Sequence, residues 1–385
     1  MRVLHVIDEL GLGGGAEHSL AVLLPMLRDR GVDSSVACLV DRPTDGLQAK
    51  LQDDGFDVEG LPRGKVGRLR GLRRLVRARQ PDLVHATLIY SCLTTRLALA
   101  GVHIARVDSL VNTSYDPIRT SALHIPPWKM RTLRAVDGFT AQRLGGHFHV
   151  ISETVSAEAQ DVLNIDPVNI TLIPRGRDPA RMGERSVGRS LDVRRRLGID
   201  PDAYVLLNVG RQDHQKAQDD LVRAFALVRR SHPDTTLLLA GRPGDATGEI
   251  NRAIHETGTT GFVKLLGHRD DVADLCAAAD VFVFPSLYEG LGCALLEAMA
   301  LGVPIVGSDA AAIREVLRDG RLGCVVQRGD VPGLAGAITG LLDDVSLRQD
   351  LGSRARREFE ERYDLNRVAD STVTMYEEVL SRHGR

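Results

Sequence analysis

Two cations in the second half of the chain have the types and spacing that phosphate-ester chemistry needs. Arg211 and Lys216 follow the apolar run at 205–209. The planar fork of an arginine and the point charge of a lysine can together neutralise a diphosphate. That neutralisation is the electrostatic stabilisation that a leaving diphosphate requires. A solvated loop with unrelated charges is the alternative interpretation of the same two residues.

Two carboxylates, Glu289 and Glu297, lie eight residues apart after the apolar run at 281–284. A carboxylate accepts hydrogen bonds from several donors, such as the hydroxyls of a sugar or a ribose. Glu289 is expected in the turn, and Glu297 about a turn and a half into the following helix. The first backbone amides of that helix would face a ligand at its N terminus, and they belong to Leu291, Gly292 and Cys293. An acidic cap and a surface glutamate are the alternative.

A glycine-rich segment, Gly11-Leu-Gly-Gly-Gly-Ala-Glu17, follows the first apolar run. Glycines let the backbone approach a phosphate, and the next helix points its N terminus at it. The candidate phosphate-side residues are Gly13, Gly14 and Gly15. The segment also matches the GxGxxA dinucleotide fingerprint, with Asp41 near the end of the second strand. That match supports an NAD-dependent oxidoreductase as an alternative, but it leaves the cations and carboxylates without a role. A plain flexible turn is the structural alternative.

Short apolar runs alternate with amphipathic ones, which predicts parallel sheets with helices on both faces. Strands are predicted at 3–7, 35–40, 83–86, 105–110, 147–151, 170–173, 205–209, 236–240, 262–265, 281–284, 304–306 and 324–326. Helices are predicted at 17–30, 47–54, 69–80, 154–163, 218–231, 272–278, 292–301 and 331–342. The charged stretch at 174–200 is predicted to contain the domain boundary, as a linker that leads into a helix. We therefore expect two doubly wound α/β domains facing across a cleft, with ligands at the carboxyl ends of the strands.

Composition excludes several classes of protein. The chain has 385 residues, a net charge of −2 and 4% aromatic residues, which argues against a nucleic-acid partner. The five cysteines form no CxxC pair, which argues against a zinc site and favours a reducing, cytoplasmic compartment. The start of the chain lacks a signal-peptide pattern, and no apolar window is long enough to span a membrane. The one D-x-D spacing, Asp200 to Asp202, reads as a turn and not as a metal site.

The combination of GGAE after the first strand, VGR…K at 209–216, E-x7-E at 289–297 and AMALGVPIVGSD at 298–309 resembles a known family. It is the GT-B fold, retaining glycosyltransferases called family 4, or glycosyl transferases group 1. The resemblance runs from residue 1 to about 380 and is strongest over 205–316. It implies two Rossmann-like domains: an acceptor domain at 1–176, a nucleotide-sugar donor domain at 177–365, and a helix at 366–385 that crosses back to the first domain.

The resemblance also implies a function. It implies a retaining, metal-independent transfer of a hexose or N-acetylhexosamine from a nucleoside-diphosphate sugar, with UDP favoured and GDP possible. The acceptor would be a hydroxyl of a glycan, a glycolipid or a small glycoside, as in bacterial cell-envelope polysaccharide biosynthesis. No cofactor is implied beyond the nucleotide sugar. A sugar-nucleotide epimerase and a nucleotide-sugar-binding protein without turnover remain alternatives.

Roles carry over position by position from the family. Arg211 and Lys216 match the pair that holds the donor diphosphate, Glu297 matches the ribose-binding glutamate, and Glu289 matches the glutamate near the transferred sugar. The amides of 291–293 match those that line the sugar and phosphate. The remaining donor-side positions lie in the loop that contacts the base, namely Gly267, His268 and Arg269. Tyr363 and the helix at 367–382 resemble the tail that returns to the first domain.

The chain departs from the family pattern in two places. Val111 occupies the position where many relatives carry a histidine beside the sugar, so Asn112 or Thr113 is a candidate for orienting the acceptor or the sugar. Arg175 replaces the asparagine of an I-P-N-G sequence and is a candidate for binding an anionic acceptor, or a linker charge. His85 ends a strand and is a further candidate for the cleft.

Two segments of the first half suggest a membrane surface. Residues 63–79 contain eight cations and no acid, with an apolar stripe at Leu69, Leu72, Leu75 and Val76. Such a helix either lies peripherally on an anionic membrane or packs its stripe on the sheet. The segment 121–131 carries the single Trp and is expected to be a loop, either a mobile acceptor-side loop, a shallow membrane contact or a buried connection.

Overall fold

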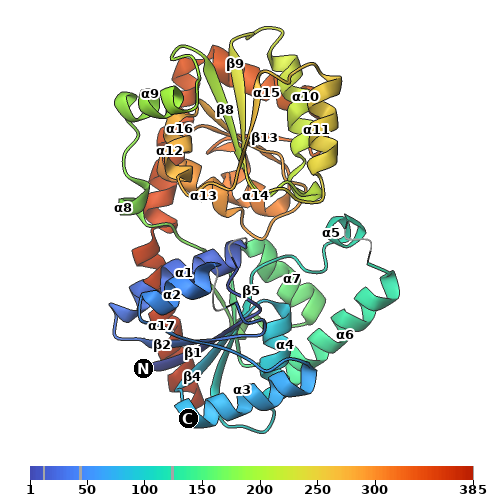
Figure 1. The fold of residues 1–385 in the computed structure, drawn as a ribbon. Helices are drawn as coiled ribbons and strands as arrows, with labels where there is room; N and C mark the ends of the chain where they lie inside the picture. Colours follow the sequence, from blue (N-terminus) through green and yellow to red (C-terminus); the bar gives the residue numbers. More distant parts are fainter. Residues whose placement is uncertain (12–13, 43–45, 123–124, 385) are drawn as a thin grey trace. The chain divides into compact units, whose positions relative to one another are not determined.

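The computed structural model describes residues 1–385 except 12–13, 43–45, 123–124 and 385. The chain divides into two compact units: unit 1 comprises Met1–Gly176 and Leu365–Arg385, and unit 2 comprises Arg177–Asp364. Each unit contains one parallel sheet covered by helices (Figure 1), which confirms the predicted pair of doubly wound α/β domains.

Unit 1 is built on a seven-stranded sheet in the order β3-β2-β1-β4-β5-β6-β7. Its strands are β1 (Arg2–Ile7), β2 (Asp33–Cys38), β3 (Asp57–Gly60), β4 (Leu83–Thr87), β5 (Ala105–Leu110), β6 (His147–Val150) and β7 (Ile170–Leu172). Its helices are α1 (Gly15–Arg28), α2 (Gly46–Asp53), α3 (Lys65–Arg79), α4 (Ile89–Ala98), α5 (Pro117–Ala122), α6 (Pro127–Leu144), α7 (Glu153–Leu163), η1 (Pro167–Asn169) and α17 (Leu365–His383).

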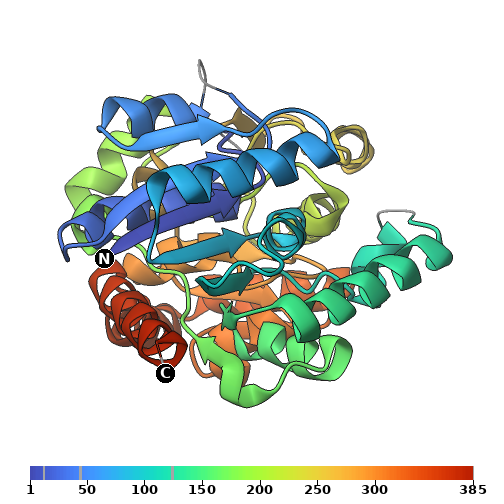
Figure 2. The same ribbon diagram turned by 90° about the horizontal axis from the view of Figure 1, so that it is seen from below.

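The last helix, α17, is part of the core of unit 1. Its buried Met375 and Tyr376 pack in one cluster with Val3 of β1 and Val107 of β5. Figure 2 shows this helix beside the strands of the unit although it is more than 180 residues away from them in the chain. The end of the chain therefore contributes to the fold of the first unit.

Unit 2 is built on a six-stranded sheet in the order β10-β9-β8-β11-β12-β13. Its strands are β8 (Tyr204–Val209), β9 (Thr235–Ala240), β10 (Val263–Gly267), β11 (Val281–Phe284), β12 (Ile305–Ser308) and β13 (Cys324–Val326). Its helices are α8 (Pro179–Met182), α9 (Val187–Arg196), η2 (His214–Lys216), α10 (Gln218–Val228), α11 (Thr247–Glu256), α12 (Val272–Ala278), α13 (Cys293–Ala300), α14 (Ala311–Val316), η3 (Arg318–Gly320), α15 (Val331–Asp343) and α16 (Val345–Arg362). The central strands are buried on both faces, which explains their continuous apolar runs.

Every predicted strand is present, with ends that differ by at most two residues. Strand β3 was not predicted, because its four residues Asp57-Val-Glu-Gly60 carry only one apolar side chain at the sheet edge. The prediction of a loop at 121–131 is wrong at both ends, because residues 121–122 belong to α5 and residues 127–131 belong to α6. Pro127 occupies the first position of α6, where a proline is preorganised for a helix and needs no amide partner.

The structure also separates the two interpretations of the basic segment 63–79. In α3, Leu72, Leu75 and Val76 are buried in a core cluster that includes Val84 of β4. The apolar stripe therefore packs inside unit 1 and is not exposed to a membrane. Among the described residues, no helix has the length and apolar character needed to cross a bilayer.

Candidate functional site

The sheet of unit 2 changes winding direction between two strands, β8 and β11. From β8 the chain continues to β9 on one side, and from β11 it continues to β12 on the other. Loops that follow such a pair of strands diverge and leave a crevice at the carboxyl edge of the sheet, which is where ligands bind in open α/β folds. The loops after β8 and β11 carry three of the four predicted chemistry-bearing residues: Arg211, Lys216 and Glu289.

Hydrogen bonds hold these two loops together. The backbone amide of Leu287 donates to the carbonyl of Gln215 at 2.8 Å, and the Gln215 side-chain amide donates to the carbonyl of Tyr288, also at 2.8 Å. Gln215 lies in η2, one residue before Lys216. The double connection fixes the lysine relative to the loop that contains Glu289.

Lys216 and Glu289 form an ion pair through Nζ and Oε1. Their side chains are 16% and 10% exposed, so the pair is mostly shielded from water but reachable from one side. Lys216 Nζ also lies 4.9 Å from the centre of the Phe284 ring. A Cβ at position 210 would come within 3.2 Å of the lysine stem, so Gly210 provides the space in which this side chain extends. The structure thus joins two residues that were predicted to act on one ligand.

Arg211 is placed differently from Lys216. Its guanidinium pairs with Asp213 and is 48% exposed. A half-exposed side chain of this length can reorient toward an incoming anion, whereas Lys216 is already fixed. In this structure the two cations therefore contact separate carboxylates, and their convergence on one diphosphate remains a prediction.

Glu297 lies on α13, and its carboxylate is held by an arginine that sequence analysis missed. Arg177 Nε donates to Glu297 Oε1 at 2.7 Å, and the two side chains are 6% and 13% exposed. Burial acts to lower the pKa of Arg177, but the charges and hydrogen bonds of Glu297 and Cys293 together outweigh burial and raise it, so the guanidinium stays charged. The Arg177 amide donates to the carbonyl of Tyr363 at 2.9 Å, which fixes the segment between the units to the end of α16.

No local signal distinguishes Arg177 in the sequence. It lies in the charged stretch that was interpreted as a linker, beside Arg175 and Arg181, and its partner is 120 residues away. Only the fold shows that one of these arginines is buried and orients a predicted site carboxylate.

The N terminus of α13 has a glycine cap. Gly292 has a φ of +85°, and a Cβ there would approach Phe284 Cε1 to 3.1 Å and Leu295 Cδ1 to 3.0 Å. A side chain at this position would be both strained and crowded. Because glycine has no side chain to accept from the first-turn amides, those amides are directed at whatever lies before the helix. Leu291 and Gly292 are buried and Cys293 is half-buried, so the predicted amides line a shielded position.

The predicted base-contacting loop follows β10. Gly267 ends the strand with a φ of +67°, and its carbonyl accepts from the Gly241 amide at 2.8 Å. A Cβ at 241 would collide with the carbonyl oxygen of Gly210 at 1.9 Å, so the ends of β8, β9 and β10 approach each other closely. His268 pairs with Asp270 at 3.3 Å and Arg269 with Asp271 at 2.5 Å. The loop belongs to the same carboxyl edge as Lys216.

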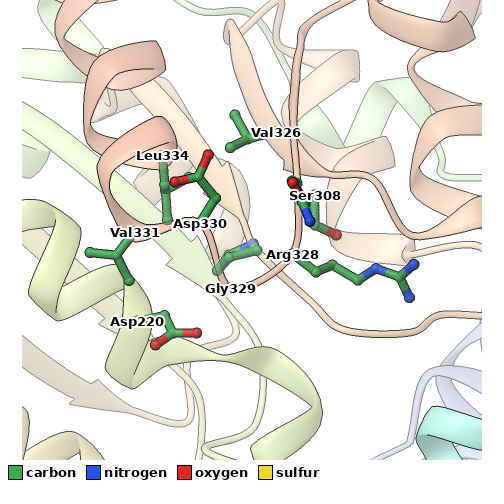
Figure 3. A pocket seen from close by; sticks show the side chains of 10 residues that line it. Asp220, Ser308, Val326, Arg328, Gly329, Asp330, Val331 and Leu334 are labelled. Carbon is green, nitrogen blue, oxygen red and sulfur yellow. The ribbon is translucent and has the colours of Figure 1, made fainter.

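A small cavity lies at the ends of β12 and β13 (Figure 3). Its volume is about 10 Å³, enough for a single water molecule. Arg328, on its rim, donates through Nε to Asp309 at 2.8 Å and through Nη1 to the carbonyl of Leu287 at 3.1 Å. This cavity contains none of the predicted site residues, and Arg328 supports the loop that carries Glu289.

Unit 1 has a matching change of winding direction between β1 and β4. Asp8, after β1, accepts from the amide of Ser91 at 2.9 Å and from its hydroxyl at 2.6 Å, which connects the two loops. Beside Asp8 is a pocket of about 170 Å³. Its lining includes Leu88, Tyr90, Val111, Asn112, Tyr115, Arg119 and Glu158. Of the predicted acceptor residues, Asn112 lines this pocket; Thr113 is buried outside the lining.

Glu158 organises the wall of this pocket. Its carboxylate accepts from the amides of Ser114 at 2.6 Å and Tyr115 at 3.1 Å. Burial raises the pKa of Glu158 to about 7, although the two amides act to lower it. Burial also raises the pKa of Asp8. The pocket therefore contains carboxyl groups that keep their protons to a higher pH than solvated carboxyls do.

The glycine-rich segment is only partly described: Gly13 lies outside the described residues. Gly14 is the N-cap of α1, and a Cβ there would overlap the Glu17 carboxylate, whose Oε2 is 1.7 Å from that point. In this structure the Glu17 side chain therefore covers the N terminus of α1, the helix to which it belongs. Arg175 is half-buried, and its charge acts on Glu17 and on His149.

His85 is not a pocket residue, and its interpretation as a cleft histidine is wrong. It is buried, with Nδ1 2.6 Å from the Tyr376 hydroxyl and Nε2 2.6 Å from Ser109 Oγ. Burial lowers its pKa, so the ring is neutral and serves to connect β4 to α17 and β5.

Comparison with known proteins places both units in one group. Residues 14–176 match the family described as Glycosyl transferase 4-like domain, and residues 203–344 match the family described as Glycosyl transferases group 1. Glycogen synthase of Mycobacterium tuberculosis is 30% identical over 306 residues, which cover 78% of this chain and 69% of that protein. The lipopolysaccharide core biosynthesis glycosyltransferase LpsE of Rhizobium meliloti is 26% identical over 389 residues, with coverage of 97% and 98%.

Several other curated relatives are matched over only 49% to 60% of their own length. Among solved structures, Anabaena Alr3699/HepE in complex with UDP and glucose has a TM-score of 0.84 and 23% identity. The match covers 98% of this chain and 100% of that one, and it shows that the fold is shared.

Proposed function

Because the chain belongs to the group 1, family 4-type glycosyltransferases of the GT-B fold, we propose that it is a retaining, metal-independent hexosyltransferase. The donor is a nucleoside-diphosphate hexose or N-acetylhexosamine, with UDP as the favoured nucleotide. The acceptor is a hydroxyl of a glycan, a glycolipid or a small glycoside. The observation that carries this proposal is the shielded Lys216–Glu289 pair where the sheet of unit 2 changes direction.

The donor site follows from charge and geometry. The diphosphate displaces Glu289 from the ammonium of Lys216 and attracts the half-exposed Arg211, while the α13 amides face the phosphates. Glu289, once released, accepts hydroxyls of the transferred sugar. Glu297 is oriented by Arg177, and since that contact engages one of its two oxygens, the carboxylate retains capacity for the ribose hydroxyls.

In the proposed reaction, the bond between the anomeric carbon and the diphosphate oxygen breaks while the acceptor oxygen bonds to the same face of that carbon. The acceptor proton passes to the departing phosphate. Lys216, Arg211 and the helix amides stabilise the charge that develops on the diphosphate, in place of a cation. Retention of configuration follows from attack on the face that the leaving group vacates.

We further propose that the acceptor binds in the unit 1 pocket. Asn112 and Glu158 provide hydrogen-bonding groups there, and Leu88 and Tyr90 provide apolar walls for the faces of a sugar ring. The cell-envelope role and the cytoplasmic, membrane-peripheral location are proposed with it. The basic segment 63–79 would contribute only long-range attraction to anionic lipids. Its exposed cations are Arg63, Lys65, Arg70, Arg74 and Arg77.

Thermal unfolding with UDP, GDP, ADP and NADH tests the donor class. A ligand at a hundred times its dissociation constant stabilises the native state by about 2.7 kcal/mol. We expect UDP to raise the unfolding temperature most. Mass spectrometry of products from a nucleotide-sugar panel, with and without EDTA, then identifies the sugar. Stabilisation by NADH alone would reverse the proposal in favour of an oxidoreductase, and loss of turnover in EDTA would contradict metal independence.

A further inference from the structure

The outward side of α6 exposes large apolar side chains in a unit whose other apolar residues are mostly buried. Trp128 is 65% exposed, Phe139 is 64% exposed and Val136 is 45% exposed. Burying side chains of this size is worth several kcal/mol, so a cluster of them in water usually marks a contact surface. Figures 1 and 2 show the beginning of α6 at the outer edge of unit 1, beside α5.

The helical spacing collects these residues on one side. Trp128 and Phe139 are eleven residues apart, which is three helical turns, or about 16 Å along the axis. Val136 lies one turn before Phe139. Cationic side chains lie on the same side of α6 and along its flanks. The exposed cations of this helix are Lys129, Arg131, Arg134 and Arg143. Within the described part of the chain, none of these four has an acidic partner. We call this surface the α6 outer face.

The opposite side of α6 is anchored in the fold. Asp137, the one acidic residue of the helix, is buried and accepts from Arg96 Nη1 at 2.5 Å and from the Tyr115 hydroxyl at 2.6 Å. Gly138 and Ala141 are buried on the same side. The helix therefore cannot turn its outer face inward without breaking a buried ion pair, and α6 itself places no acidic side chain on that face.

We propose that the α6 outer face docks unit 1 on the surface of an anionic lipid bilayer. Aromatic rings at the level of the headgroups, flanked by arginine and lysine, are the chemistry of helices that lie in a membrane interface. Trp128 and Phe139 enter the interface, and the cations contact lipid phosphates. A second copy of this chain fits less well, because self-pairing would bring identical cationic patches together. This docking rests on the proposed membrane-peripheral location and assigns it a surface, but it does not depend on the sugar-transfer chemistry.

The single tryptophan of the chain makes the test direct, because all tryptophan emission reports on Trp128. The full chain is mixed with vesicles of phosphatidylcholine and phosphatidylglycerol, and with vesicles of phosphatidylcholine alone. We expect binding to the anionic vesicles, a blue shift of the emission, and quenching by lipids brominated in the upper acyl chain. Binding without shift or quenching would overturn the proposal, as would absence of binding.

Two charge variants with equal loss of charge separate this surface from general attraction. One replaces Lys129, Arg131 and Arg143 with Gln on α6, and the matched control replaces Arg70, Arg74 and Arg77 with Gln on α3. We expect the α6 variant to lose vesicle affinity at least tenfold and the control to lose less than threefold. Equal losses, or a larger loss in the control, would contradict docking through α6.

Phe139→Ser tests the apolar part while keeping the tryptophan reporter. We expect at least a fivefold loss of vesicle affinity that high salt does not abolish, with unchanged UDP binding. A blue shift that appears on concentrating the protein without vesicles, together with a doubled mass in solution, would show that a second copy covers this face and would overturn the proposal.

Discussion

At the scale of single residues, the candidate site depends on pairs of opposite charge that are shielded from water. Lys216 and Glu289 neutralise each other, and Arg177 neutralises Glu297. A shielded charge that is left without a partner lowers stability strongly. A shielded cation whose carboxylate partner is replaced by another anion, such as a phosphate, loses little stability. The first pair is therefore suited to open for a diphosphate. In the second pair the cation is the more deeply buried, since Arg177 is 6% exposed against 16% for Lys216, and it is suited to stay in place and to orient the Glu297 carboxylate.

Removing the charge of Lys216 should slow the reaction without unfolding the protein. Lys216→Met keeps the stem beside Gly210, and we expect kcat to fall by about two to three orders of magnitude, because one preorganised electrostatic group is lost. In Glu289→Gln we expect kcat to fall by a similar factor while the affinity for UDP is retained. Lys65→Met, which removes the same charge from an exposed position of α3, is the control. Rates in either site variant that equal those of the control would refute the assignment.

Arg177→Met should destabilise the chain by about 3–5 kcal/mol, because it leaves the Glu297 carboxylate buried without its cation. Urea unfolding measures this change. The double variant Arg177→Met/Glu297→Leu should recover part of that stability, since both charges are then absent. If the single and double variants are equally stable, the pairing contributes nothing and Arg177 does not hold Glu297.

At the scale of elements, a chain of buried histidines connects four strands of unit 1 to its last helix. His85 contacts Tyr376 of α17 and Ser109 of β5, and Ser109 Oγ lies 2.6 Å from His149 Nδ1 on β6. The ring of His5 on β1 lies beside that of His85, with 5.6 Å between the ring centres and an angle of 40° between the planes. Burial lowers the pKa of His5 to about 4 and that of His149 to about 4. In the folded protein these imidazole rings are therefore neutral and act as hydrogen-bonding groups.

Acid should therefore weaken unit 1. The unfolded chain takes up protons on these histidines below pH 6.5, while the folded chain does so only near pH 4, so stability is lost as the pH falls between the two. We expect a loss of about 2 kcal/mol per histidine between pH 7 and pH 5, measured by urea unfolding. The variant His5→Gln/His149→Gln should show a flatter dependence over that range. If the stability of the variant depends on pH as steeply as that of the original chain, the two rings are not neutral in the folded protein.

At the scale of the whole molecule, the chain passes from unit 1 to unit 2 and returns. Unit 2 ends at Asp364, and α17 then completes the core of unit 1 with Val368, Met375, Tyr376 and Val379. The fold of the first unit thus requires both ends of the sequence, whereas the predicted donor residues other than the glycines of 13–15 lie on the internal segment 177–364. A core substitution in α17 should therefore lower the stability of unit 1 without changing the affinity for the donor.

Met375→Ala should lower the free energy of unfolding of unit 1 by about 2–5 kcal/mol, since the side chain is 2% exposed and its loss leaves a cavity. Met375→Leu, which conserves volume, is the control and should cost less than about 1.5 kcal/mol. UDP affinity, measured by calorimetry below the unfolding temperature, should stay within twofold in both. A parallel loss of UDP affinity would mean that the donor site depends on unit 1.

The amino-acid sequence by itself determined the strand and helix alternation, the glycine-capped start of α13 and the identity of the cations and carboxylates at strand ends. These features depend on neighbours within a few residues, through hydrophobic periodicity and backbone conformation. The tertiary structure alone decided which charges meet. Lys216 and Glu289 are 73 residues apart, and Arg177 and Glu297 are 120 apart. It also decided that the stripe of α3 is buried while the aromatic side chains of α6 are exposed. Local pattern cannot specify such outcomes, because strand order and packing determine which surfaces are covered and which distant side chains come into contact.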